Sequence, residues 1–416
     1  MLEQYFHHPR VLRRLLASPV HDQIERYVVY LNERGHTYEG VQQYVQAIEH
    51  FFDWALKENQ GAITPIDKAI VCRFLTEHIP ICDCSPPASR TMITLRAALN
   101  HLLHICESEE ESDLPESNND RLIDAYLTYL KNNCGLAAQT LNYRARYARE
   151  FLSYLNHAGE TDVAALMPQD IMQFMVNCAG RCKRSSAQVI ACSLRSFLRF
   201  LQMNGLCSMQ LVRAVPRIPN WKMEGIPVTL SEAQLSSLLH AFDKTSATGL
   251  RDYAITLCMT EIGLRVSEVV NIALDDVDWR RGILNITSPK VRRSRCLPLT
   301  EHVGAAIAQY IKCGRPEVKS RQLFLRHRAP VCEPLTPKVV GGVIYRAYRR
   351  AGLPESINGT HILRHTIATR LYQNGASLKD LADLLGHQSL ETTVIYTKVN
   401  LPQLATVALP WPEERS

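Results

Sequence analysis

An internal repeat of about 100 residues constrains this 416-residue chain more than any other feature. The stretch IERYVVYLNERGHTYEGVQQYVQAIEHFFDWAL (24–56) runs parallel to IDAYLTYLKNNCGLAAQTLNYRARYAREFLSYL (123–155), and Phe51 matches Phe151 at an offset of 100. In both copies apolar residues recur at i, i+3, i+4 and i+7, which predicts four short amphipathic helices in each. The period is too long for a solenoid repeat, so we expect two related helical domains.

Two stretches separate the predicted domains. ESEEESDLPESNND holds seven acidic residues, no basic residue and Pro115, which is typical of a solvated linker. Pro216, Pro219 and Pro227 restrict helix formation after the second copy, and Ser231 is the expected N-cap of the next helix. The predicted organisation is an additional N-terminal helical domain (1–106), an acidic linker (107–120), a second helical domain (121–205), a proline-containing linker (206–226) and a third domain with a C-terminal tail (227–416).

The third domain alternates between helical and extended patterns. Residues 251–274 and 336–352 have helical periodicity, whereas GILNITSPKVRRSRCLPLT (282–300) indicates a strand, a basic turn and a returning strand. Ser377 with Asp380 approximates a capping box, and Gly386 offers a C-cap just before His387. The expected fold class is mainly α with one small β-hairpin.

Charge is distributed unevenly along the chain. Residues 121–416 carry 37 Lys or Arg against 23 Asp or Glu, whereas residues 1–106 carry 10 against 11. This imbalance favours a polyanionic partner for the C-terminal part, with a solvated basic surface as the alternative. The predicted DNA contacts are the basic residues of the second helical copy and of the basic turn: Arg144, Arg146, Lys183, Arg184, Arg195, Arg292, Arg293 and Arg295.

Neither a membrane segment nor a metal site is predicted. The chain has no run of about 18 apolar residues and no signal-peptide pattern at its start, so we expect a cytoplasmic protein. The closest cysteine pairs, Cys82 with Cys84 and Cys178 with Cys182, lack a second pair at zinc-ligand spacing, which favours reduced thiols. No carboxylate cluster accompanies the later histidines, so metal-dependent hydrolysis is disfavoured.

The segment THILRHTIATR (360–370) raises the question of an anion. His361, Arg364 and His365 are spaced by three and four residues and share one face of a helix. Three such side chains repel one another when charged, unless an anion lies among them. Other candidates each have an ordinary structural explanation. Arg265 with Glu268 could be a helix ion pair, and Tyr396 could be a core residue.

Together these segments resemble the tyrosine recombinase family, also called phage integrases, of the Xer or transposon type. TEIGLRVSEVVNIALDDVDW is similar to the family's first arginine box, HILRH to its H-x-L-R-H box, and LLGHQSLETTVIYTKV to its final box, where nine positions separate His387 from Tyr396. Lys290 lies eight residues before Pro298, where the family keeps a lysine on a β-hairpin. The resemblance covers roughly residues 228–400 and, more loosely, the core-binding domain at 121–205.

The resemblance implies two tandem helical, SAM-like domains followed by an α-rich catalytic domain with a small β-sheet. It also implies a site-specific DNA recombinase that cleaves and rejoins strands through a covalent 3′-phosphotyrosine, without metal or nucleotide cofactor. Residues 1–106 are an addition that simpler members lack. They could bind further DNA, or contact another protomer or a partner recombinase, and their near-neutral charge favours protein contact.

The resemblance also assigns a role to each residue of the boxes. Arg265 and Arg364 would stabilise the pentavalent phosphorus, since an arginine fork suits paired oxygens. Tyr396 would attack the phosphate, and because its pKa is normally near 10, a base such as His361 would help. The remaining roles are a proton from Lys290 to the departing 5′ oxygen, a phosphate hydrogen bond from His387, orientation of cations by Glu268, and packing or bracing by His365.

The assembly implied by the resemblance is four protomers on two double-stranded DNA recombination sites, alone or with partner recombinases. The tail at 401–416 could dock on a neighbour or pack within its own chain. Two rival functions stay open: a non-catalytic DNA-binding or architectural protein, and a type IB-like topoisomerase. Integration, excision, transposition and chromosome dimer resolution all fit the sequence, which does not specify the DNA target.

Overall fold

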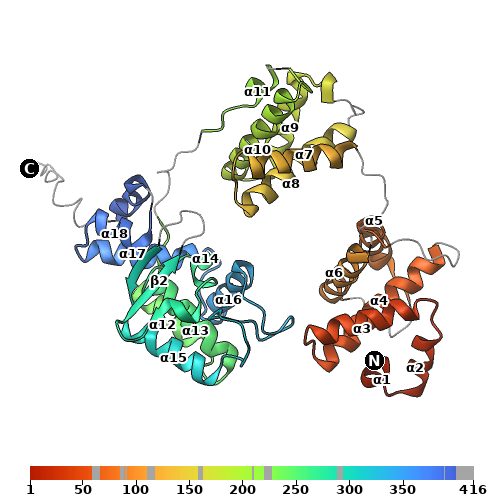
Figure 1. Ribbon diagram of the computed structural model, residues 1–416, viewed down its shortest axis with the longest axis horizontal. Coiled ribbons are helices and arrows are strands. Elements are labelled where there is room, and N and C mark those ends of the chain that lie inside the picture. The colour runs from red at the N-terminus through yellow and green to blue at the C-terminus, as the bar shows by residue number, and fades with distance from the viewer. Residues whose placement is uncertain are drawn as a thin grey trace, which may run out of the picture. The chain divides into compact units, whose positions relative to one another are not determined.

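The computed structural model describes residues 1–58, 66–84, 89, 91–109, 118–157, 163–208, 210–219, 227–287, 294–387 and 389–399. These residues are mainly helical, with one three-stranded sheet (Figure 1), which confirms the predicted fold class. Buried hydrophobic residues form three large clusters, one before residue 107, one within 122–218 and one after 229. No described helix combines the length and apolarity needed to cross a membrane.

The N-terminal helices pack around large aromatic residues. Tyr27, Phe51 and Phe74 are fully buried, and the Tyr27 hydroxyl donates a hydrogen bond of 2.9 Å to the Ala98 carbonyl, joining α3 to α6. The elements are α1 (Leu2–Tyr5), α2 (Pro9–Leu16), α3 (His21–Glu33), α4 (Tyr38–Glu58), α5 (Lys68–Arg73), the π-helical turn η1 (Phe74–His78), the 3-10 turn η2 (Ile79–Ile81) and α6 (Met92–Glu109).

The second set of helices belongs to a compact unit that spans Asp113–Gly225. Tyr126, Phe151 and Phe174 are buried there at the positions that the repeat pairs with Tyr27, Phe51 and Phe74. Equal burial at matched positions is expected when two copies share one packing scheme. The elements are α7 (Asn118–Asn132), α8 (Ala138–His157), η3 (Val163–Ala165), α9 (Pro168–Arg181), α10 (Arg184–Met203) and α11 (Gln210–Ala214).

Helices extend into both predicted linkers. Helix α6 continues to Glu109, and α7 already begins at Asn118. Asp120 in the first turn of α7 stabilises that helix, because its negative charge lies near the positive end of the helix dipole. Residues 110–117 of the acidic stretch lie outside the described part. In the second linker, α11 buries Leu211, and Val215 follows it into the same cluster. Burial of these two apolar side chains holds this segment against the helical domain, although the surrounding sequence is polar and rich in proline.

The C-terminal unit combines helices with a small antiparallel sheet. The predicted hairpin is present, with Leu284 opposite Leu297 and both side chains buried. A third strand of two residues was too short to predict. The elements are α12 (Glu232–His240), α13 (Ala247–Thr260), α14 (Val266–Val269), η4 (Leu274–Asp276), β1 (Val277–Asp278), β2 (Ile283–Thr287), β3 (Ser294–Pro298), α15 (Glu301–Cys313), α16 (Pro337–Arg350), α17 (His361–Gln373), α18 (Leu378–Leu385), η5 (Leu390–Thr392) and η6 (Val394–Val399).

The helix predicted over 251–274 is broken in the middle. Gly263 has a φ of +74°, and a Cβ there would lie 3.1 Å from Leu385 Cδ2 and 3.2 Å from Ile367 Cγ2. Glycine is therefore required both by the backbone and by the packing. The break separates α13 from α14 and leaves Arg265 just before the first turn of α14.

Candidate active site

Glu268 is the buried acid at the centre of the site. Its side chain is 5% exposed and bridges two guanidinium groups, accepting from Arg265 Nη1 at 2.9 Å and from Arg295 Nη2 at 2.9 Å. Glu268 Oε2 also accepts from the Arg265 backbone N–H at 2.8 Å, so it caps its own helix. One carboxylate therefore fixes two arginines that are 30 residues apart.

The C-terminal end of α18 holds the second arginine. Arg364 is buried on α17, and its Nη2 donates to the Leu385 carbonyl, while its Nη1 donates to Gly263 O at 2.5 Å. Arg265 Nη1 reaches the same Leu385 carbonyl at 3.2 Å. The negative end of the helix dipole stabilises both cations, so the two guanidinium groups converge on one point.

The site has a surplus of positive charge among the described residues. Three guanidinium groups, those of Arg265, Arg295 and Arg364, interact with the single carboxylate of Glu268. Burial and the neighbouring Arg265 lower the pKa of Arg364 to about 9, which leaves it charged at neutral pH. An arrangement with excess fixed cations is suited to bind an anion such as a phosphodiester.

Tyr396 lies beside these cations in the same chain. It is 2% exposed, packs with Ala368 and Leu385, and its hydroxyl lies 3.1 Å from Nδ1 of His365. Burial raises the pKa of the phenol, and the positive charges of Arg364 and Arg265 partly oppose that increase. The histidine in contact with the phenol is thus His365, for which the resemblance implied packing or bracing.

His387 and His361 occupy two edges of the site. Gly386 ends α18 in the left-handed conformation as predicted, and it turns the chain so that His387 Nδ1 lies 2.8 Å from Thr393 Oγ1. His361 begins α17, where the helix N-terminus favours anions. Part of the His361 side chain is open to solvent. Partial burial of its ring nevertheless lowers its pKa, and the positive charges of Arg364 and Arg265 lower it further.

Comparisons with known proteins agree with this arrangement. The family model described as the phage integrase family matches residues 229–402, and its N-terminal SAM-like domain matches 123–205. An integrase/recombinase of Sinorhizobium fredii, y4rA, is 33% identical over 410 residues, 97% of each chain. Tyrosine recombinase XerD of Listeria monocytogenes is 33% identical over 294 residues, 69% of this chain and 96% of its own. The chain belongs to the phage integrase family.

The fold agrees with solved members of the phage integrase family. The crystal structure of the XerH site-specific recombinase bound to palindromic difH substrate, a post-cleavage complex, covers 82% of this chain and 95% of its own at a TM-score of 0.57 and 19% identity. Family membership makes the protein a tyrosine recombinase, an enzyme of site-specific recombination. The family models begin at residue 123, so the first helical copy lies outside them, whereas y4rA matches this chain over almost its whole length.

Two of the predicted DNA contacts also have intramolecular partners. Arg295 was predicted as a DNA contact, but it stands on β3 with its guanidinium turned inward onto Glu268 and against Gly386. Arg195 was predicted likewise, but its Nη2 donates to the carbonyls of Val215 and Pro216 at 3.5 and 2.7 Å and holds the chain after α11. Each side chain thus already has an intramolecular role, which sequence position alone does not reveal.

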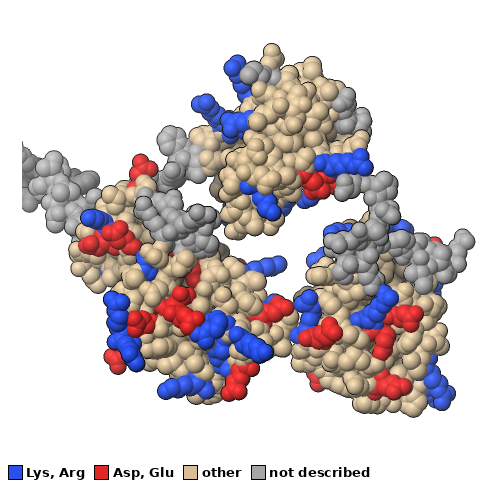
Figure 2. Space-filling view, in the orientation of Figure 1, with Lys and Arg blue, Asp and Glu red and all other residues tan. Residues whose placement is uncertain are grey.

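The other predicted DNA contacts lie in the second helical domain and in the turn between β2 and β3. Arg146, Lys183 and Arg184 are exposed, whereas Arg144 is half-buried, with its Nη2 3.4 Å from Cys192 Sγ. In the view of Figure 2, Lys and Arg are prominent on helices α7–α11 with few acidic residues, whereas both charges mix on the N-terminal helices. Lys290, Arg292 and Arg293 lie outside the described residues.

We expect the histidines of the site to destabilise the fold in acid. Burial and the charges of Arg364, Arg265 and Arg295 lower the pKa of His387 from 6.5 to about 4. The unfolded chain binds a proton on His387 more tightly than the folded chain does. The stability of the fold is therefore unaffected by this proton above about pH 6.5, and it decreases as the pH falls from 6.5 toward 4. Its slope is up to about 1.4 kcal/mol per pH unit. Urea unfolding of His387→Gln between these pH values should show a shallower slope than the native chain.

The native chain, measured over the same pH range, is the reference for this slope. An unaltered slope in His387→Gln would contradict the assignment of this pH dependence to His387.

Proposed function

We propose that this recombinase cleaves DNA through a 3′-phosphotyrosine formed at Tyr396. The observation that carries the proposal is the position of the buried phenol, next to Arg364 and Arg265 within one chain and in contact with His365. The attacking oxygen bonds to phosphorus as the 5′ oxygen leaves, so no energy-rich cofactor is consumed. A 5′-hydroxyl of another strand then reverses the step and releases the tyrosine.

Each neighbour of the phenol has a role that its position supports. Arg265 and Arg364 would bind the nonbridging oxygens that gain charge in the transition state. His365 would accept the phenol proton, because its Nδ1 is already within hydrogen-bond distance. His361 would then contact the phosphate from the start of α17, which differs from the base role expected from sequence. Lys290 keeps its predicted role as the acid for the 5′ oxygen.

His387 and Glu268 would act mainly through other residues. Thr393 Oγ1 fixes His387 Nδ1, so Nε2 is the nitrogen left to donate to the phosphate. Glu268 positions Arg265 and Arg295. Thr393 lies between the 3-10 turns η5 and η6, and Tyr396 follows three residues later within η6. The Tyr396 N–H donates to the Thr393 carbonyl at 3.0 Å, so the two residues share one side of the chain. The last box therefore positions His387 and the nucleophile together.

The experiment that separates this function from its rivals uses two labelled duplexes carrying the same site. A recombinase exchanges strands between the duplexes and yields joint products. A topoisomerase would relax supercoiled DNA without joint products, and an architectural protein would shift the duplexes on a gel without cleaving them. Relaxation alone, or binding alone, would overturn the proposal.

We propose that the second helical unit grips the DNA backbone through Arg146 and Lys183, which are exposed on α8 and just before α10. Each phosphate contact releases counterions, so the double variant Arg146→Ala/Lys183→Ala should make the slope of log affinity against log salt shallower by about 2. Fluorescence anisotropy on a labelled site at several salt concentrations measures this slope. The control Lys312→Ala/Lys319→Ala removes two exposed lysines of the C-terminal unit, and an equal change there would contradict the assignment.

The assembly and setting are part of the same proposal. Four protomers on two duplexes would bring two cleavable strands together, acting in the cytoplasm on chromosomal or plasmid DNA. The match to the integrase/recombinase y4rA over almost the whole chain supports integration as the outcome. The proposed domains keep the order of extra helical domain, core-binding domain and catalytic domain. The tail at 401–416 lies outside the described residues.

A further inference from the structure

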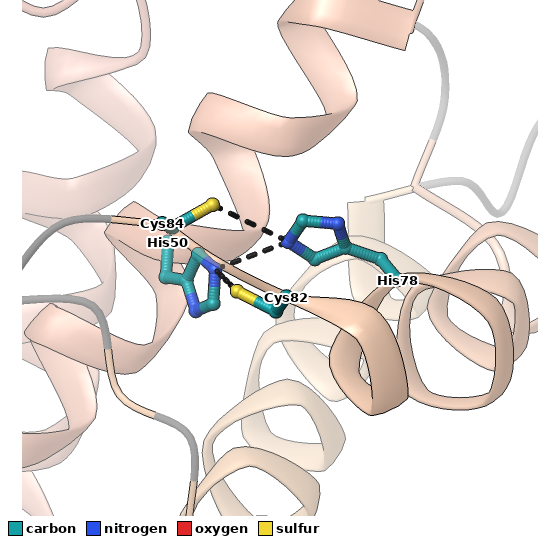
Figure 3. A group of neighbouring side chains, drawn as sticks. All are labelled: His50, His78, Cys82 and Cys84. Carbon is teal, nitrogen blue, oxygen red and sulfur yellow. Dashed lines mark hydrogen bonds between the residues drawn. The ribbon is translucent and has the colours of Figure 1, made fainter.

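Four metal-binding side chains meet in the N-terminal helical domain. His50 comes from α4, His78 ends the π-helical turn η1, and Cys82 and Cys84 follow η2 (Figure 3). Their ligand atoms all lie within 4.8 Å of one another. His50 is buried and the other three are half-buried, so the group lies at the edge of the domain core.

Three of the distances within the group are close to those of a tetrahedral metal site. His50 Nε2 lies 3.2 Å from His78 Nε2 and 3.4 Å from Cys82 Sγ, and Cys84 Sγ lies 3.6 Å from His78 Nε2. Zinc bonds of about 2.0–2.1 Å to nitrogen and 2.3 Å to sulfur, set at tetrahedral angles, place neighbouring ligand atoms about 3.3–3.8 Å apart. The side chains are therefore spaced as if around a common centre.

The hydrogen bonds around His50 Nε2 do not account for its surroundings. The His50 Nδ1 lies 2.9 Å from the Ser89 carbonyl, which can only accept, so Nδ1 carries the proton. His50 Nε2 then has a single lone pair, yet both His78 and Cys82 approach it. A cation at the centre would satisfy both imidazole lone pairs and both thiolates at once. The Ser89 contact is also the kind of outer support that fixes metal-binding histidines.

The ring contacts hold both histidines in place without a metal. Phe74 stacks on His78 with ring centroids 5.3 Å apart and meets His50 edge-on at 5.2 Å. Trp54 covers His78 from α4 at 5.8 Å. The π-helical turn Phe74–His78 adds one residue per turn and so sets the direction of His78, in keeping with the frequent occurrence of such turns at functional sites.

The second repeat copy places a cation at the corresponding point. At the offset of 100 residues, His50 corresponds to Glu150, and His78 to Cys178. There Arg181 Nη2 lies 3.2 Å from Glu150 Oε1 and 3.7 Å from Cys178 Sγ. In the second copy a guanidinium group thus joins α8 to α9. In the first copy the corresponding place offers four ligands for a metal cation.

We propose that His50, His78, Cys82 and Cys84 bind one zinc ion that joins α4 to the segment after η1. A closed set of two imidazoles and two thiolates favours a structural zinc over a catalytic one, because no coordination position is left for water. The ion would stabilise the additional N-terminal domain and keep Cys82 and Cys84 reduced. This inference does not depend on the recombinase activity.

The first test uses the unaltered full-length chain. Purified without chelators, it should contain about one zinc ion per molecule by elemental analysis. Zinc should also protect Cys82 and Cys84 from alkylation, measured by peptide mass spectrometry, and a strong chelator should remove that protection. Exposed Cys72 on neighbouring α5 should react equally with and without metal. A metal-free chain whose Cys82 and Cys84 are alkylated at the same rate with and without added zinc would overturn the proposal.

The second test uses variants in the full-length chain. Cys82→Ser/Cys84→Ser should lower zinc affinity by about 100-fold or more, since loss of even a supporting contact costs 10–100-fold. Cys72→Ser/Cys134→Ser, which removes two exposed thiols, should keep the metal. Cys84→His retains four ligands and should recover most binding, which separates loss of a ligand from loss of folding. A Cys82–Cys84 disulfide in the isolated protein, or full zinc content in the double serine variant, would overturn the site.

Discussion

A Tyr396→Phe chain is expected to bind its DNA site but to form no covalent protein–DNA adduct. The phenol oxygen is the atom proposed to bond to phosphorus, and no chemistry of the phenyl ring replaces it. The effect should therefore be complete loss of the adduct rather than a partial decrease. A nicked DNA site that traps the cleaved strand, followed by a denaturing gel, measures the adduct directly.

The fold should tolerate this change. Tyr396 is 2% exposed, and phenylalanine fills the same space against Ala368 and Leu385. The lost hydrogen bond to His365 should lower the free energy of unfolding by about 0.5–1.5 kcal/mol, which urea unfolding can verify. Tyr345→Phe, at an exposed position on α16, is the matched control and should form adduct at the native level. An adduct in Tyr396→Phe would show that another residue is the nucleophile.

The helical architecture could be predicted because its signals are local. Apolar periodicity marks each helix, and caps such as Ser231 and Ser377 lie beside the helices that they begin. The break at Gly263 was missed because the apolar pattern continues through it. The positive φ of Gly263 and its close packing against Leu385 and Ile367, both more than 100 residues later, are visible only in the fold.

The residues of the site could be identified from the sequence, but not all of their contacts. The boxes include Arg265, Arg364 and Tyr396, which the structure brings together. The inward orientation of Arg295 was missed because alternation along a strand does not say which face meets Glu268. His361 and His365 lie four residues apart and share one face of α17, so the sequence does not distinguish them. Only the fold shows that the phenol of Tyr396 contacts His365.

The proposed zinc ligands are not evident from the sequence for a related reason. Cys82 and Cys84 have no second cysteine pair nearby, and the other two proposed ligands are histidines. His78 lies four residues before Cys82, which is a usable local signal, but His50 comes from another helix. A pattern search that allows mixed histidine and cysteine ligands would have found three of the four.

Replacing Glu268 by glutamine is expected to cause the largest loss of stability among changes at the site. The amide has nearly the same shape, but it removes the negative charge that compensates Arg265 and Arg295, and its NH₂ group would face cations. Breaking a buried ion pair costs about 3–5 kcal/mol, and the lower end applies because Arg265 is a third exposed. Urea unfolding of the full-length chain measures the difference.

The same variant tests whether the arginines are arranged for a phosphate. A bound phosphodiester would supply the negative charge that glutamine lacks, so DNA carrying the site should restore part of the lost stability by mass action. We therefore expect the difference between Glu268→Gln and the native chain to be smaller with DNA than without it. Asp275→Asn, which removes an exposed pair with Arg321, should have little effect in either condition. An equal deficit with and without DNA would mean that Glu268 supports the fold but that the phosphate does not reach these arginines.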